Sequence, residues 1–274
     1  MIGYGNSMFL ATHGILARAA SGGGVDPDAQ AFITAAGITN PTQQGAINTL
    51  VLALKGYSIW TKFKAIYPIV GGTAATHKWN LKDPRDLDAA FRLTYATGVT
   101  HSSTGMAGNG SSGYADTFFS LGTTYKNSNH ISAYVRSNID ELANEMGAAT
   151  ALNVSVISIG TRYSNTAYFG NQINNSSIAF SNTDSRGFWI NSRQSSSLFK
   201  ALKNGSVVGT DTNTVGDTIS FDISLMARST AGSRIFYSTR QLAFASIGDG
   251  LTDTDAANFY TAVQAYQTTL NRQV

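Results

Sequence analysis

The 274-residue sequence contains no cysteine, which excludes disulfides, thiolate metal sites and cysteine nucleophiles together. Charge is also scarce: Asp, Glu, Lys and Arg make up 13% of the chain, about half of the roughly 25% usual in globular proteins. No apolar run reaches the roughly 18 residues of a membrane span, and the first residues lack the basic-then-apolar pattern of a signal peptide. We therefore expect no membrane partner and no secretion by a signal peptide.

The few charges also argue against a nucleic-acid partner. The chain has 19 Lys and Arg against 16 Asp and Glu, a net charge of +3. These residues are spread along the sequence without a basic run, whereas surfaces that bind phosphate concentrate Lys and Arg on one face. We therefore predict that the protein does not bind nucleic acid.

Neutral polar residues take the place of the missing charge: the chain has 29 Ser, 30 Thr, 20 Asn and 27 Gly. The hydrophobic fraction of 42% and the aromatic fraction of 11% still suffice for a packed core, so an intrinsically disordered chain is excluded. This length fits one large all-β domain with an appendage, because sandwiches and barrels often exceed about 200 residues as one unit.

The N-terminal quarter predicts an arm followed by two helices. Residues 1–25 mix Gly and Ala with a few apolar residues and include a run of three glycines, and we interpret them as an arm. This arm either packs against a neighbouring chain in an assembly or folds back on its own domain. Helices are predicted to start after Asp26 and Asn40, each a capping residue followed by proline, and the first should stop at Gly37. The second helix carries one apolar stripe that needs a covering partner, formed by Ile47, Leu50, Val51 and Leu54. We assign residues 26–64 to a helical anchor.

From about residue 65 the hydrophobic period changes. Apolar and polar residues alternate over residues 131–136 and 219–225, and a similar apolar run dense with Ser covers residues 154–159. This pattern is typical of half-buried antiparallel strands. Short strands separated by Gly, Asn and Ser at regular intervals predict a β-sandwich over residues 65–274.

Two further signals lie in the last third of the chain. Asn204-Gly205 stands between two apolar runs, which is the strongest short-range hairpin signal. Thr252 and Asp255 resemble a capping box in which Asp replaces the usual Glu, and an apolar stripe follows. The sandwich is therefore predicted to close with a C-terminal helix.

Motifs that could carry catalysis stand in the wrong context. Gly108 to Gly113 match the dinucleotide pattern G-x-G-x-x-G, but residues 114–119 predict a strand where that site needs a helix. The two glutamates of the chain, Glu141 and Glu145, would share one face of a helix and are more typical of a solvated turn than of the paired acids of a glycoside hydrolase.

Metal and nucleophile signatures give the same result. The four histidines are far apart in sequence, and no G-x-S-x-G elbow or EF-hand loop is present. A Ser–His pair assembled only in three dimensions stays open. We predict no catalytic residue, no metal site and no cofactor.

Aromatic side chains stand beside amides and a guanidinium between residues 163 and 193, a mixture that can bind sugars. The candidate glycan-binding residues are Tyr168, Trp189, Asn191 and Arg193. In the alternative interpretation, which we favour, the large aromatic residues belong to the sandwich core and the amides close loops.

Four segments resemble concanavalin A-like, laminin-G-like lectin domains. Residues 105–117 are similar to the G-x-x-x-x-G-x-x-x-Y-x-x-T opening of that family, and residues 129–136 to the strand after it. Residues 203–205 resemble its N-G hairpin, and residues 251–260 its closing helix. The resemblance implies a jelly-roll sandwich. It supplies no catalytic residue, and calcium ligands cannot be matched residue by residue, so neither is transferred.

The whole chain also resembles virion structural proteins of tailed phages, especially those infecting Bacteroidetes. The similarity is carried by residues 26–33, 47–51, 60–62, 65–73, 80–82 and 100–105. It implies short helices before a lectin-like sandwich on the particle surface, as a decoration, head fibre or tail component. The implied location is the virion, assembled in the host cytoplasm, and the implied partners are copies of the same chain and other virion proteins.

Three hypotheses follow for function. The first is a non-enzymatic virion protein, since a nearly neutral surface lets many copies pack without repulsion. The second is an adhesin that binds a host surface glycan through Trp189 and its neighbours. The third is a polysaccharide depolymerase on the same fold.

Overall fold

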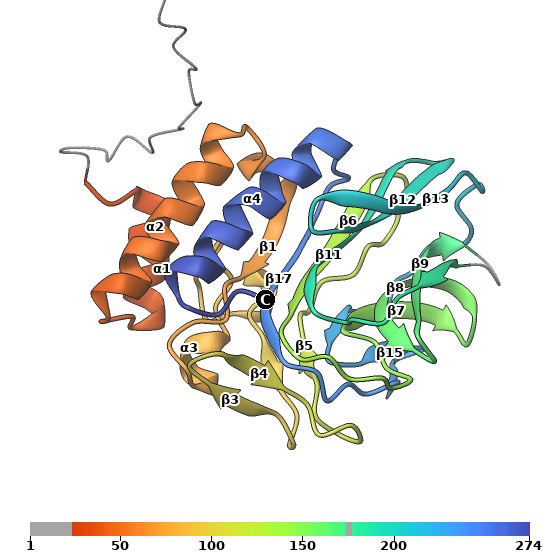
Figure 1. Ribbon diagram of the computed structural model, residues 1–274, viewed down its shortest axis with the longest axis horizontal. Coiled ribbons are helices and arrows are strands. Elements are labelled where there is room, and N and C mark those ends of the chain that lie inside the picture. Colours follow the sequence, from red (N-terminus) through yellow and green to blue (C-terminus); the bar gives the residue numbers. More distant parts are fainter. Residues whose placement is uncertain (1–23, 174–176) are drawn as a thin grey trace, which may run out of the picture.

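The computed structural model describes residues 24–173 and 177–274, and it is mainly β (Figure 1). Two sheets, which we call sheet A and sheet B, pack as a jelly-roll sandwich, and helices cover the outer face of sheet A (Figure 1). The predicted fold class is therefore confirmed. Most of the predicted arm, residues 1–23, lies outside the described residues. Within the described ranges, no helix has the length and apolar character to cross a membrane.

The helices form where their caps place them. Helix α1 (Pro27–Ala36) starts at Asp26, which accepts a hydrogen bond from the Asp28 amide, and ends at Gly37, whose φ of 64° few other residues adopt. Helix α2 (Pro41–Gly56) starts at Asn40 and buries its predicted apolar stripe. Both predictions are confirmed. The other helices are α3 (Ala74–His77), α4 (Asp253–Thr269) and the 3₁₀ turns η1 (Trp60–Lys62) and η2 (Asp88–Ala90).

Sheet A has the strand order β13-β12-β11-β6-β17-β4-β3, and β1 pairs with β17 at one side of this path. The strands are β1 (Phe63–Tyr67), β3 (Thr100–Ser102), β4 (Gly105–Ala107), β6 (Asn129–Val135), β11 (Gly187–Ser195), β12 (Leu198–Lys203), β13 (Ser206–Asp211) and β17 (Leu242–Gly248). The predicted hairpin joins β12 to β13. Asn204 and Gly205 have φ values of 51° and 77°, as a tight hairpin turn requires.

Sheet B has the strand order β10-β9-β8-β7-β14-β5-β2, and β15 runs parallel to β7 and pairs with β16. Its strands are β2 (Thr94–Tyr95), β5 (Ala115–Asp116), β7 (Met146–Ala151), β8 (Val154–Tyr163), β9 (Thr166–Ile173), β10 (Ile178–Ser181), β14 (Ser224–Leu225), β15 (Arg228–Thr230) and β16 (Ser233–Ile235). Long antiparallel pairing over β7, β8 and β9 makes this part a continuous surface.

Two apolar clusters lie on the two sides of sheet A. One fills the space between the sheets, with Trp189, Phe169 and Ile157 among its members. The other lies between the outer face of sheet A and helices α1, α2 and α4, where Phe188 and Phe259 meet. Figure 1 shows α2 and α4 beside β1 and β17, with sheet B on the far side of sheet A. The molecule therefore has three layers: helices, sheet A and sheet B.

Several expectations about individual elements are wrong. Strand β6 is buried on both faces, and not half-buried, because helices cover its polar-looking side. Residues 219–223 form no strand; Ile219 and Ile223 are buried from an irregular segment that joins β14. Likewise only Ala115 and Asp116 of the predicted strand at 114–119 pair in a sheet.

The two glutamates do not share a helix either. Glu145 is fully buried and accepts hydrogen bonds from Thr161 and from Arg240 Nη1, the latter at 2.5 Å. Glu141 instead binds Ser238 and Thr239. Both acids bind residues of the segment that leads into β17, and they themselves lie just before β7, so the predicted solvated turn does not exist.

Candidate functional site

Three of the four residues predicted to bind a glycan are fully buried. Trp189 lies in the core between the sheets and donates its indole N–H to the Ser185 carbonyl at 2.8 Å. Asn191 and Arg193 follow on the same face of β11, and neither is exposed to solvent. Side chains without any solvent-exposed surface cannot contact a glycan, so these three residues form no binding surface here. Tyr168, 38% exposed, lies apart from them on β9.

The buried amides nevertheless organise the neighbouring sheet. Asn191 donates to the carbonyls of Ser158 at 2.8 Å and Gly170 at 2.6 Å, one on β8 and one on β9. It also accepts a hydrogen bond from Asn171 at 2.7 Å. Arg193 binds the carbonyl and amide oxygens of Asn171. This polar group within the sandwich fixes sheet A to the backbone of β8 and β9.

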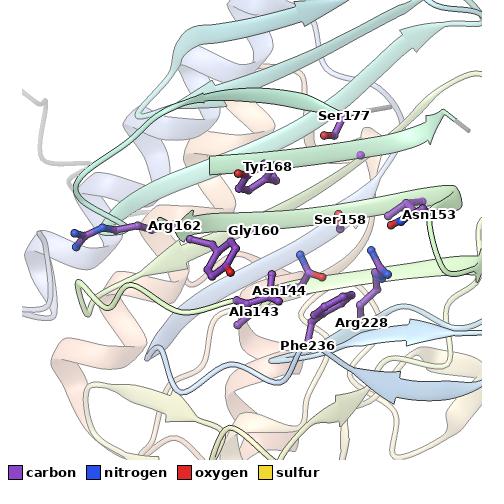
Figure 2. A pocket seen from close by; sticks show the side chains of 14 residues that line it. Ala143, Asn144, Asn153, Ser158, Gly160, Arg162, Tyr168, Ser177, Arg228 and Phe236 are labelled. Atoms are coloured by element: carbon purple, nitrogen blue, oxygen red, sulfur yellow. The ribbon is translucent and has the colours of Figure 1, made fainter. Parts of the chain in front are cut away.

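Directly across those two strands, the outer face of sheet B holds a groove of about 360 Å³ (Figure 2). This volume falls within the range of about 300–1,000 Å³ that is usual for small-molecule sites. The groove crosses β9, β8, the segment before β7 and the β15–β16 region, and its lining includes Tyr168, Gly170, Ser158, Gly160, Asn144, Arg228 and Phe236.

A bulge explains how neighbouring residues of β8 both reach the groove. Successive residues of a regular strand point to opposite faces, and indeed Ser158 and Gly160 line the groove while Ile157 and Ile159 enter the core. The pairing of β8 with β9 shifts register between Gly160 and Tyr163. Both Arg162 and Tyr163 therefore line the groove.

The groove offers aromatic surface beside free amide groups. Tyr163 and Tyr168 are 41% and 38% exposed, so part of each ring is accessible to a ligand. No hydrogen bond joins the side-chain amides of Asn144 or Asn153 to another described residue, and both residues line the groove. Aromatic faces and amide donors of this kind suit a ligand with both apolar and hydroxyl groups.

Arg228, on β15, is the unusual residue of the groove. Only 6% of it is exposed, and within the described residues its guanidinium makes one hydrogen bond, from Nε to Thr230 Oγ1 at 3.1 Å. Its buried Nη2 has no hydrogen-bond partner in the described part of the chain. The guanidinium lies 4.6 Å from the centre of the Phe236 ring, and burial lowers the pKa of Arg228 to about 10. In Figure 2 its nitrogens point toward β8, between Asn144 and Asn153.

The groove carries positive charge without an acid of its own. Within the described chain its lining includes Arg162 and Arg228 but no Asp, Glu or His. Arg162 is already engaged: its nitrogens bind Asn138 and Asn165, and Asp140 lies 3.4 Å away. Arg228 has no carboxylate within ion-pair distance among the described residues.

The described histidines lie outside the groove, and none of them belongs to a metal site. Across residues 24–173 and 177–274, no three His, Asp or Glu side chains gather as metal ligands would. The structure does bring together His77 and His101, 24 residues apart, with 3.0 Å between their Nδ1 atoms. Burial and the neighbouring His101 lower the pKa of His77 to about 3. Sequence spacing gave no sign of this pair.

No family model and no curated protein matches the sequence. Solved structures that resemble it include the binding domain of botulinum neurotoxin DC in complex with rat synaptotagmin II, at a TM-score of 0.52 and 15% identity over 75% of this chain and 53% of that one. A mutant of Trypanosoma rangeli sialidase displaying trans-sialidase activity gives 0.51 and 8% identity over 83% and 39% of the two chains. The structure of HCR/D-Sa-GBL1/C gives 0.50 and 16% identity over 73% and 52%.

These similarities concern the fold alone. The chain spans about half or less of the three structures named, and 23% of the Streptococcus pneumoniae sialidase NanB, which it also resembles. Identities of 8% to 16% transfer no residue role. The chain is a jelly-roll β-sandwich, and the residues of its own groove carry the evidence for its function.

Proposed function

We propose that this protein binds glycans, without cleaving them, through the groove on the outer face of sheet B. The observation that carries the proposal is the groove itself: a concave site with two exposed tyrosines on the outer sheet face that no described helix covers. Sugar rings present apolar C–H faces and many hydroxyls, so aromatic surface beside unpaired amides complements them.

Binding without cleavage is supported by the chemistry of the lining. Hydrolysis of a glycosidic bond ordinarily needs two carboxyl groups facing the same sugar. The described lining residues include no carboxyl group, and the nearby Glu145 is buried and paired with Arg240. A depolymerase would require acids that this groove does not present. Incubation with capsular polysaccharides should therefore leave their viscosity unchanged.

A glycan array with the full chain tests the proposal. We expect binding to a restricted set of glycans, lost by at least about tenfold in a Tyr163→Ala/Tyr168→Ala variant, because stacking surface accounts for a large part of such contacts. Tyr57→Ala is the matched control, since Tyr57 is 37% exposed but follows α2, away from the groove. An array without hits, or a double variant that binds as well as the wild type, would contradict the proposal.

We further propose that the glycan-binding sandwich is displayed on a phage virion as a self-associating structural protein. This rests on the resemblance of the short N-terminal helices and the sandwich to virion proteins, and on the low charge of the chain. Helices α1 and α2 share an apolar cluster with sheet A, so removing them would expose core. A deletion of residues 1–23 is therefore the cleaner test. It should dissociate the oligomer in light scattering while leaving thermal stability unchanged, and an intact oligomer would contradict the assembly role of the arm.

A further inference from the structure

The buried arginines of the described chain fall into two groups. Arg193, Arg240 and Arg272 are each at most 1% exposed, and their guanidinium groups are filled with protein acceptors. Arg272, for example, donates to Gln267 and to the carbonyls of Ile69, Pro68 and Ala243. Arg228 is comparably buried and donates only to Thr230. Structural arginines of this fold are satisfied, and Arg228 is not.

An unsatisfied buried guanidinium is costly, so its position needs an explanation. Burying a charged donor without a partner is unfavourable, and proteins normally pair such a group or expose it. Arg228 lies at the edge of the groove, where its position is fixed by the Thr230 hydrogen bond and the Phe236 ring. Phe236 itself has a φ of 54°, a strained value for a bulky residue. The guanidinium of Arg228 is thus held in place, and its Nη2 still has no acceptor among the described residues.

The missing partner should be an anion, and a planar one. Guanidinium groups bind carboxylates through two parallel N–H···O bonds, which are stronger and more directional than neutral hydrogen bonds. The described lining offers no Asp or Glu to supply this carboxylate from the protein. Asn144 and Asn153, whose amides are free, lie on either side of the guanidinium in Figure 2 and could bind the adjoining hydroxyls.

We propose that the groove selects acidic glycans, and that Arg228 binds the carboxylate of a sugar acid while Tyr163 and Tyr168 contact the neighbouring rings. This inference rests on the proposed glycan binding and specifies its ligand class. The shared chemistry is a sugar carboxylate, which either a sialic acid or a uronic acid can supply.

Titration calorimetry with the full chain separates these sources. The probes are sialyllactose against lactose, and trigalacturonate against the same trisaccharide with its carboxyl groups reduced to alcohols. We expect at least one acidic probe to bind about 10- to 100-fold more tightly than its neutral partner, as one charge-assisted pair would give. Arg228→Met should bring the acidic probe to the affinity of the neutral one. Equal affinities in both pairs, or a preference that survives Arg228→Met, would overturn the inference.

Controls keep this outcome distinct from that of glycan binding in general. Arg186→Gln removes the same charge from an exposed arginine paired with Asp184 and should leave the preference intact. Arg228→Lys keeps the charge without the fork and should lose most of the preference, which serves as the test if the Met variant does not fold. If neutral probes bind and depend on Tyr163 and Tyr168 but acidic ones gain nothing, the acidic specificity fails while glycan binding stands. If no glycan binds at all, both fail.

A spectroscopic readout needs no variant. The Arg228 Nε–Hε resonance in a nitrogen-15 NMR spectrum should shift on addition of the acidic probe and stay unchanged with its neutral partner. A purely structural Arg228 would respond equally to both probes.

Discussion

The outer faces of the two sheets differ in what covers them: helices bury that of sheet A, whereas that of sheet B is open. The outer face of sheet A carries large apolar residues such as Tyr134, Phe188 and Phe244, and helices α1, α2 and α4 bury them. The outer face of sheet B carries Gly, Ser and exposed tyrosines around a groove, and none of the described helices lies over it. Since an uncovered sheet face has to be compatible with water, the second face is free to contact a ligand.

Polar residues show the same contrast. On sheet A the hydroxyls and imidazole of Ser132, Ser246 and His130 bind one another under the helical layer. On the side of sheet B the side-chain amides of Asn144 and Asn153 and the Nη2 of Arg228 have no hydrogen-bond partner among the described residues. Satisfied polar groups stabilise the fold, whereas unsatisfied ones at a concave surface are what a ligand can use.

The largest expected effect lies on the covered face. Phe188→Ala should lower the free energy of unfolding by about 3–5 kcal/mol, because Phe188 is fully buried and its ring packs against Phe244 and Phe259. Tyr168→Ala, on the open face, should change it by less than about 1 kcal/mol. Denaturant unfolding of the two variants measures the difference. Similar losses for both would mean that the open face is as structural as the covered one.

The second-largest expected effect is a loss of stability at low pH, which comes from His130 under the helices that cover sheet A. Burial, the largest cause, and the charges of Lys62 and Lys64 lower the pKa of His130 to about 4, although its hydrogen bond to the Asp249 carbonyl raises it. The unfolded chain, with an ordinary histidine pKa near 6.5, binds the proton more readily. Stability contributed by neutral His130 is therefore complete above about pH 6.5 and is lost as the pH falls toward about 4, by up to about 3 kcal/mol.

Unfolding free energies measured between pH 7.5 and pH 4.5 test this expectation. His77, with its pKa lowered to about 3, acts in the same direction, so the wild-type slope contains both residues. His130→Gln should flatten the slope over this window, and His101→Gln, at a more exposed ring, should flatten it less. A slope unchanged by His130→Gln would show that His130 does not titrate on unfolding.

Sequence patterns predicted the fold further than the site, and particular residues show why. Asp26, Asn40 and Thr252 act through local capping hydrogen bonds, so their helices could be placed from a few adjacent residues. Trp189 and Asn191 were candidates because of their chemistry, but alternation along a strand does not reveal which sheet face the other sheet will cover.

The groove residues carried weaker signals. On β8 the alternation of Ser158 and Gly160 with Ile157 and Ile159 did mark an outer face of small residues. Arg228 carried none, because nothing near it in the chain indicates that it will be buried with one guanidinium nitrogen unpaired among the described residues. That property emerges only when β15 pairs beside β7, a contact of about 80 residues in sequence separation. Long-range pairing of this kind is invisible to local patterns.

Replacing Arg228, on the open face, should change the free energy of unfolding least. Arg228→Met should change the free energy of unfolding by less than about 1 kcal/mol or raise it, because burial disfavours the charged guanidinium, lowers its pKa to about 10, and leaves one hydrogen bond to lose. Arg193→Met is the matched control on the buried side: it leaves the carbonyls of Asn171, Ser195 and Ser196 without their donor and should cost about 3 kcal/mol or more. Thermal unfolding of both variants decides the point. If Arg228→Met destabilises as strongly as Arg193→Met, Arg228 is a structural residue and the open face loses its principal candidate for binding an anion.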